Sequence, residues 1–291
     1  MTFELIAQAT VSGLLFGAIY ALVAAGLTLI LGVMRIFNIA HGEFLMLGMY
    51  ATFFLHSRAG IDPYLALPLV TVTLFAVGCA VFLLLIRPVL NQSPNTQVLL
   101  TIGVSIFLQN AALYFFTADT RSVQVPYAQV YFRMGPVAVS LTEVVAFAGA
   151  VVVSGVLYWL LQSTEFGRAL RAAAQNRDAA MLAGINVRVI YLAAFGIGTA
   201  LLGVTAALVL PIYYVSPNIG TVFLLLAFVV VVLGGMGNFV GALVGGLIIG
   251  VTQSISASFM PGSLASVVTF GLLVLLLLFK PEGIFGHGAR L

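Results

Sequence analysis

Long apolar stretches recur along this chain, and they decide which solvent it can fold in. Residues 5–33 contain no charged side chain, and the stretches 64–86, 97–118, 141–163, 189–212 and 262–279 are nearly as apolar. A helix that crosses a bilayer needs about 20 predominantly apolar residues. Only 7% of the 291 residues are charged, whereas a soluble domain usually has about 25%. The sequence therefore predicts an all-α polytopic membrane protein.

Two further regions complicate the division into helices. Residues 43–57 form a shorter apolar stretch, and the apolar region 219–258 is interrupted by "GGMGN" at 234–238. Including these regions, we expect eight or nine transmembrane helices, some of them discontinuous, in a single transmembrane domain that covers residues 1–291.

Cationic residues in the loops predict how the chain is oriented. The longest polar segment, 164–188, carries four arginines, so the positive-inside rule places it in the cytoplasm. Counting spans from there places the N-terminus outside. Lys280 and Arg290 then lie inside if region 219–258 crosses the membrane twice.

A cluster of polar residues interrupts the apolar pattern in "MRIFNIAHGEFLM" at 34–46. It contains Asn38, His41, Gly42 and Glu43, which suit a catalytic site, a metal site, a transport pathway or a loop between two helices. A helical zinc pair needs ligands at spacings such as i, i+4, and His41 has no such partner nearby in the sequence. Intramembrane hydrolysis would need a nucleophile with its base, and the sequence shows no such combination. We therefore expect no metal, no cofactor and no enzymatic activity.

An autonomous ion-coupled carrier or channel is the alternative class. Ionisable side chains within spans are costly and mark ion pathways, but Glu43 is the one carboxylate predicted to lie deep. No GxxxxGK[ST] loop occurs in the sequence, so an ATPase that drives transport would be a separate chain. The chain also lacks a basic run that would indicate nucleic-acid binding.

Two regions of the sequence resemble each other and predict a parallel internal repeat. "GVMRIFNIAHGEFLMLGMY" is followed by an apolar stretch that ends at Arg87-Pro88, and "GGMGNFVGALVGGLIIGV" by one that ends at Lys280-Pro281. The alignment pairs Asn38 with Asn238, and paired helix interruptions of this kind point to the substrate pathway of a transporter. Alternatively, two leucine-rich helices that each end at a cation and a proline can look alike without a repeat. The glycines at 234–246 also allow either helix breaks or close helix packing.

The polar segment 164–188 reads as one helix with a polar face. Arg168, Arg171, Gln175 and Asp178 follow at spacings of three and four residues beside a stripe of alanines, and Glu165 can pair with Arg168. Gly184 supplies a helix stop. Such a compact helix can fit a groove on a partner protein, although a solvated cytoplasmic hairpin would also explain the pattern.

Three of these stretches resemble a known family. "GLTLILGVMRIFNIAHGEFLMLGMY", "EFGRALRAAAQNRDAAMLAGINV" and "VLGGMGNFVGALVGGLIIG" are similar to the branched-chain amino acid ABC-importer permeases, specifically to the smaller of the two permease subunits. The resemblance extends from near residue 5 to about residue 285. In the last stretch, many relatives have a small polar residue such as serine where this chain has Asn238.

The resemblance implies a multi-pass subunit of the bacterial inner membrane. Its partners would be a second, paralogous permease, two ATP-binding-cassette ATPases and a periplasmic substrate-binding protein that delivers leucine, isoleucine or valine. Relatives that carry urea, short amides or other amino acids leave the substrate open. We expect the substrate pathway to involve Asn38, His41, Gly42, Glu43, Gly234, Gly235, Gly237 and Asn238. We expect ATPase coupling to involve Glu165, Gly167, Arg168, Arg171, Gln175, Asn176, Asp178 and Gly184.

Overall fold

The computed structural model describes residues 2–135 and 137–286, so Arg290 lies outside the described residues. The helices are α1 (Thr2–Met34), α2 (His41–Ala59), α3 (Pro63–Val81), α4 (Arg87–Val89), α5 (Pro94–Phe116), α6 (Leu141–Ser163), α7 (Glu165–Gln175), α8 (Arg177–Leu182), α9 (Val187–Val209), α10 (Ile219–Gly234), α11 (Phe239–Phe259) and α12 (Gly262–Phe279). A π-helical turn at Phe82–Ile86 joins α3 to α4, and a 3-10 turn covers Pro126–Gln129. Two antiparallel strands, β1 (Tyr131–Met134) and β2 (Val137–Ser140), form one small hairpin. The all-α fold class is confirmed.

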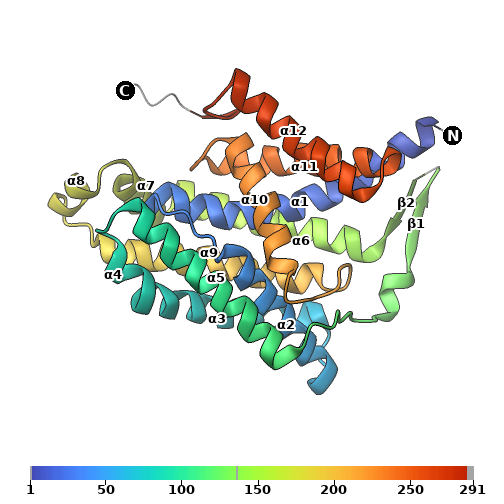
Figure 1. Ribbon diagram of the computed structural model, residues 1–291, viewed down its shortest axis with the longest axis horizontal. Helices are drawn as coiled ribbons and strands as arrows, with labels where there is room; N and C mark the ends of the chain where they lie inside the picture. Colours follow the sequence, from blue (N-terminus) through green and yellow to red (C-terminus); the bar gives the residue numbers. More distant parts are fainter. Residues whose placement is uncertain (1, 136, 287–291) are drawn as a thin grey trace.

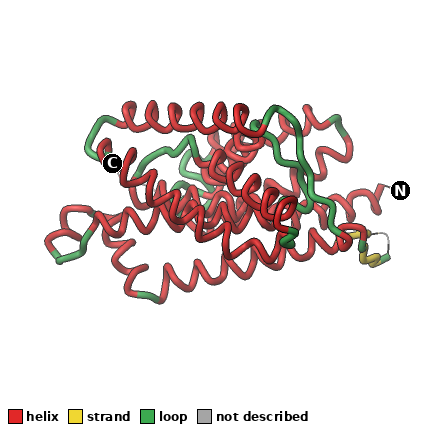
Figure 2. Tube along the Cα trace, turned by 90° about the horizontal axis from the view of Figure 1, so that it is seen from below, coloured by secondary structure: helices red, strands yellow, loops and turns green. Residues whose placement is uncertain are grey.

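The long helices form a bundle with two distinct ends (Figures 1 and 2). One end carries α7 and α8, and the other carries the β1–β2 hairpin; we call them the α7–α8 end and the hairpin end. Within the described residues, α1, α3 with α4, α5, α6, α9 and α11 are the 6 helices long and apolar enough to cross a membrane. The shorter α2, α10 and α12 run beside them, so the expected total of eight or nine spans stays a prediction.

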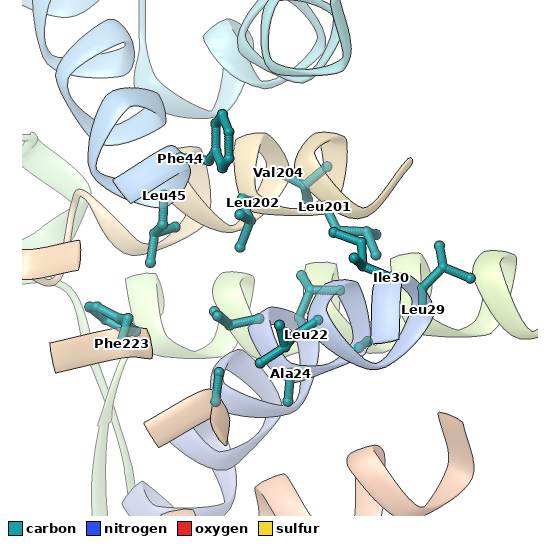
Figure 3. Close-up of a cluster of buried hydrophobic side chains, with 14 of the residues drawn as sticks. Leu22, Ala24, Leu29, Ile30, Phe44, Leu45, Leu201, Leu202, Val204 and Phe223 are labelled. Carbon is teal, nitrogen blue, oxygen red and sulfur yellow. The ribbon is translucent and has the colours of Figure 1, made fainter. Parts of the chain in front are cut away.

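Helices α1 and α9 form the core of the bundle. In their most apolar windows, 83% of α1 and 78% of α9 are buried, against 11% of α5. Leu22 and Ile30 of α1 face Leu201 and Leu202 of α9, and Phe44 of α2 closes the cluster (Figure 3). Burial of apolar area in lipid supplies little driving force, so such helices depend on close packing.

Helix starts follow from local sequence chemistry. Asp62 precedes Pro63 and accepts a hydrogen bond from the Tyr64 amide (2.9 Å), which caps α3. Ser140 and Glu143 form a capping box at the start of α6. In both helices the side chains satisfy amides that the first turn leaves unpaired.

Loops at the hairpin end are fastened to one another. The Arg121 amide donates to the Val215 carbonyl (2.9 Å) and the Val215 amide donates back (2.7 Å), which joins the loop after α5 to the loop after α9. The Tyr127 hydroxyl donates to Asp62 (2.8 Å). Burial and this hydrogen bond raise the pKa of the Tyr127 phenol above its ordinary value. This end of the bundle is therefore held as one unit.

Candidate functional site

The polar cluster begins where the chain turns back into the bundle after α1. Arg35 has a left-handed backbone (φ 56°), which few non-glycine residues adopt, and the following residues are non-helical up to Ala40. At the start of α2, Nε2 of His41 lies 3.1 Å from the Val23 carbonyl oxygen. Val23 is about 16 Å along α1 from Met34 at about 1.5 Å per residue. Helix α2 therefore begins deep inside the bundle. His41, its first residue, forms a side-chain hydrogen bond there with the backbone of α1.

Three polar side chains of this cluster are almost completely buried. Asn38, His41 and Glu43 are exposed by 2%, 0% and 1% respectively. Nδ2 of Asn38 and Nδ1 of His41 have no hydrogen-bond partner among the described residues, whereas the Glu43 carboxyl group interacts with the side chains of Ser105 and Thr221. Buried polar groups are almost always paired, and within a membrane protein they mark functional positions.

A polar stripe on α5 holds this region in place. Thr101, Ser105 and Gln109 are spaced four residues apart, so they share one face of the helix. Thr101 donates to the Phe37 carbonyl (3.1 Å), Ser105 to Glu43 Oε1 (3.3 Å) and Gln109 to Asn218 Oδ1 (2.8 Å). Helix α5 thus binds the segment after α1, the buried carboxyl group and the loop before α10.

The two glycines Gly42 and Gly220 bring α2 against α10. A Cβ atom on Gly42 would overlap the Gly220 carbonyl oxygen, and one on Gly220 would lie 2.6 Å from Glu43 Oε2. Real Cβ atoms do not approach other atoms so closely. The contact requires glycine on both helices.

A groove open along one side follows α10 past this cluster. A cavity of about 200 Å³ lies between α1, residues 37–39 and α10, and a neighbouring cavity of about 420 Å³ continues toward the α7–α8 end. The two cavities share Leu31 and Phe37, and we call them together the α10 groove. They are lined by Leu27, Leu31, Gly32, Arg35, Phe37, Asn38, Ile39, Ala174, Leu224, Leu225, Phe228, Met236 and Gly237. Of the three buried polar residues, Asn38 is the one that lines the groove.

The predicted interruption in 219–258 is present, between α10 and α11. Gly235 and Gly237 have φ values of 100° and 82°, and Asn238 Oδ1 accepts from the Gly241 amide (2.9 Å), which caps α11. The first interruption differs, because Ala40 precedes α2 and Asn38 caps nothing. The internal repeat stays a prediction. Of the two asparagines that the alignment pairs, Asn238 caps a helix and Asn38 does not.

The chain after α12 fastens this second interruption. The Ile284 amide donates to the Leu233 carbonyl (2.8 Å) and the Phe285 amide to the Gly234 carbonyl (3.2 Å). Nδ2 of Asn238 donates to the Phe285 carbonyl (3.0 Å). These bonds satisfy carbonyls that the end of α10 leaves free.

The expectation of one continuous helix in 164–188 is wrong. Asn176 has an extended backbone (φ −149°, ψ 108°), and its side chain accepts hydrogen bonds from the amides of Asp178 and Ala179. Asparagine favours such a cap over a helix interior, so the segment divides into α7 and α8. Gln175 and Asp178 consequently lie on different helices. Gly184 has a left-handed backbone (φ 82°) just beyond the end of α8, as a helix stop requires.

Helix α7 packs tightly on the end of α6. The Arg171 guanidinium donates to the Leu161 carbonyl, and a Cβ on Gly167 would overlap that same carbonyl oxygen. Glu165 pairs with Arg168 at 3.5 Å, as its spacing predicted. On α8, Met181 and Leu182 are 47% and 90% exposed. Neither of these two apolar residues was predicted from the sequence to contact a partner.

The structure brings only part of the predicted sites together. Ala174 of α7, Arg35 and Gly237 line one cavity of the α10 groove, so the coupling segment and both interruptions meet there. The α5 stripe, Phe228 and residues 284–285 are additional elements that the sequence analysis missed. A spacing of four between Thr101, Ser105 and Gln109 on an apolar helix was the signal for the stripe.

Comparison with known proteins identifies the family. Residues 9–277 match the family described as "Branched-chain amino acid transport system / permease component". The chain is 34% identical to the high-affinity branched-chain amino acid transport system permease protein BraD of Pseudomonas aeruginosa, covering 96% of this chain and 95% of BraD. It is 32% identical to LivH of Escherichia coli K12, over 96% and 95% of the two chains. It is 28% identical to a probable LivH of Methanocaldococcus jannaschii, over 94% and 90%. The expected resemblance is confirmed, and this multi-pass membrane protein belongs to the family of permease components of branched-chain amino acid transport systems.

Proposed function

We propose that this chain forms one wall of an import pathway for branched-chain amino acids in the bacterial inner membrane. The α10 groove supports this proposal, because it is open along one side and passes buried Asn38. Helix α5 stands beside it and exposes most of its apolar surface. A second, paralogous permease packed against this face would close the groove into a pathway.

The apolar lining favours a substrate with an apolar side chain. Leu224, Leu225 and Phe228 line the groove. Phe37 also lines it, and the centroids of the Phe37 and Phe228 rings lie 6.2 Å apart. A branched aliphatic side chain can replace lipid or water there without loss of hydrogen bonds. Urea, short amides and other amino acids remain alternative substrates, since a binding protein would make most of the selection.

The α7–α8 end is proposed to lie in the cytoplasm and to contact two ATP-binding-cassette ATPases. The arginines of 164–188 support this orientation, and exposed Met181 and Leu182 provide an apolar contact. A shift of α7 would reach the groove through Ala174, which lines it together with Gly237. The periplasmic binding protein would then deliver substrate at the hairpin end, near the N-terminus, and the C-terminus would be cytoplasmic.

Cysteine labelling in the assembled transporter tests the pathway. In a Cys79→Ala background, we expect a thiol reagent to inhibit uptake by Leu225→Cys and Phe228→Cys, and leucine with its binding protein to slow the labelling. Leu65→Cys is a control, because Leu65 is 75% exposed on α3, away from the groove. Labelling of Leu225→Cys and Phe228→Cys without any effect on uptake would exclude the groove as the pathway.

The driving force separates the importer from an ion-coupled carrier. Proteoliposomes with the complete complex should take up leucine only when ATP is supplied on the ATPase side. Uptake by this chain alone, driven by an ion gradient, would instead establish the carrier. A parallel panel of valine, isoleucine, urea and acetamide would identify the substrate class.

A further inference from the structure

A further cavity, which shares no lining residue with the α10 groove, lies on the face between α6 and α11. We call it the trough. It has a volume of about 400 Å³, and its lining is almost entirely apolar. Leu14, Ala18 and Ala21 of α1 contribute to its lining, and the residues of α6 that line it extend from Phe147 to Tyr158. The distance from Phe147 to Tyr158 along α6 is about 16 Å at about 1.5 Å per residue. One leaflet of a bilayer has a hydrocarbon depth of about 15 Å, half of about 30 Å, so the length of the trough is comparable with the depth of one leaflet.

A pocket that is more polar than the trough adjoins it at the α7–α8 end. Its volume is about 390 Å³, and Tyr158 lines both cavities. Thr28, Gln162, Arg171 and Asn238 line the pocket, and Arg171 is the one charged residue among the described residues in its wall. The lining therefore changes from apolar to more polar and cationic toward the α7–α8 end.

Three observations indicate that the pocket suits an anion. The first residues of α11, Phe239 and Val240, line it, and the start of a long helix carries a partial positive charge. The Thr28 side chain is 2% exposed, and its hydroxyl has no hydrogen-bond partner among the described residues. Arg171 uses one of its N–H groups on the Leu161 carbonyl, and a guanidinium has five such groups, so others remain for a phosphate group.

We infer that the trough and the pocket together bind one anionic phospholipid from the leaflet at the α7–α8 end. An acyl chain lies in the trough, and the phosphate group lies between Arg171 and the start of α11. Basic pockets between transmembrane helices bind anionic headgroups in this way. A helix of the partner permease would fill the apolar trough but would leave the cationic pocket without a counter-ion. The pocket shares Gly32, Ala174, Met236 and Gly237 with the α10 groove. The inference rests on the membrane location of the chain and on Arg171 and the start of α11, which do not line that groove.

Native mass spectrometry of the assembled complex can test this site. Detergent-purified complex is mixed with phosphatidylglycerol or phosphatidylcholine of the same chain length. We expect selective retention of phosphatidylglycerol, and its loss in Gly155→Phe. Gly155 borders the trough, and a Cβ atom there meets no atom within 4 Å, so the ring can fill the trough without disturbing the helix. Gly271→Phe on α12 is the matched control, because a Cβ atom there also meets open space.

The headgroup contact has its own test. Arg171→Gln should lower the preference for phosphatidylglycerol over phosphatidylcholine about fivefold, which corresponds to about 1 kcal/mol per cation at a membrane surface. Equal retention of both lipids by the wild-type complex would overturn the inference. So would unchanged phosphatidylglycerol binding in Gly155→Phe. A photo-crosslink from residue 155 to the partner permease would show that a protein helix occupies the trough.

Discussion

The Ser105 hydroxyl donates a hydrogen bond to Glu43 Oε1 across the 3.3 Å between α5 and α2. This bond joins the most exposed long helix of the bundle to one of its most deeply buried carboxyl groups. The neighbouring residues on the same face of α5 are Thr101 on one side and Gln109 on the other. They form hydrogen bonds to the Phe37 carbonyl and to Asn218. The position of α5 beside the α10 groove therefore depends on a few polar contacts.

Replacement of Glu43 distinguishes a structural carboxyl group from a proton carrier. Glu43→Gln keeps the shape and an oxygen that can accept from Ser105, so we expect uptake within a factor of about three of wild type. Glu43→Leu removes the acceptor and should lower stability by about 1–3 kcal/mol. Initial rates of uptake and thermal unfolding of the purified complex measure both effects. Complete loss of uptake in a well-folded Glu43→Gln variant would favour a proton-carrying role.

The contact between Gly42 and Gly220 leaves no room for a larger side chain at either position. Gly42→Ala places a methyl group on the Gly220 carbonyl oxygen, so α2 and α10 must separate. Overpacking of this kind costs about 1–3 kcal/mol, and we expect a lower unfolding temperature together with slower uptake. Gly103→Ala on α5 is the control, since its methyl group meets nothing within 4 Å. Equal unfolding temperatures for the two variants would contradict this prediction.

The helices and their order could be predicted from the sequence because hydropathy is local. The span predicted at 141–163 coincides with α6, and the interruption at "GGMGN" is where α10 ends. Glycines at 235 and 237 and a capping asparagine at 238 act on their immediate neighbours, so their effect can be read from the sequence.

Long-range contacts could not be predicted in the same way. The non-helical return of residues 35–40 into the bundle brings them beside α10, which is far away in the sequence. The bonds of residues 284 and 285 to the end of α10 likewise join distant segments. In 164–188 the helical periodicity correctly predicts helical structure, but the preference of Asn176 for a capping position divides the segment into α7 and α8. Met181 and Leu182 were missed because only the structure shows that they are exposed.

Exposed Leu182 predicts a contact with the ATPase. Leu182→Asp should weaken retention of the ATPase on the purified permease and reduce uptake, because a charge would replace an apolar contact. Leu65→Asp on α3 is the control, since Leu65 is similarly exposed on a different helix. Pull-down of the tagged permease, followed by measurement of the ATPase-to-permease ratio, provides the readout. Retention of the ATPase by Leu182→Asp at the wild-type ratio would place the contact elsewhere.

Asn238 performs two functions that substitutions can separate. Its Oδ1 atom caps α11 through the Gly241 amide, and its Nδ2 atom holds the Phe285 carbonyl. Asn238→Asp and Asn238→Ser keep a capping oxygen but lose the donor to Phe285. Asn238→Ala loses both contacts, and loss of the cap costs about 1 kcal/mol. The Ala variant should therefore be the least stable of the three.

Hydrogen exchange of the assembled complex measures the two contacts independently. The amides of Ile284 and Phe285 donate to Leu233 and Gly234, so their exchange should accelerate in all three variants as the segment loosens. Amides in the first turn of α11 should accelerate only in Asn238→Ala. If Asn238→Asp leaves Ile284 and Phe285 as protected as in the wild type, the two backbone hydrogen bonds hold the segment without the side chain. Because the Gly235–Gly237 turn borders the α10 groove, acceleration there should accompany slower uptake.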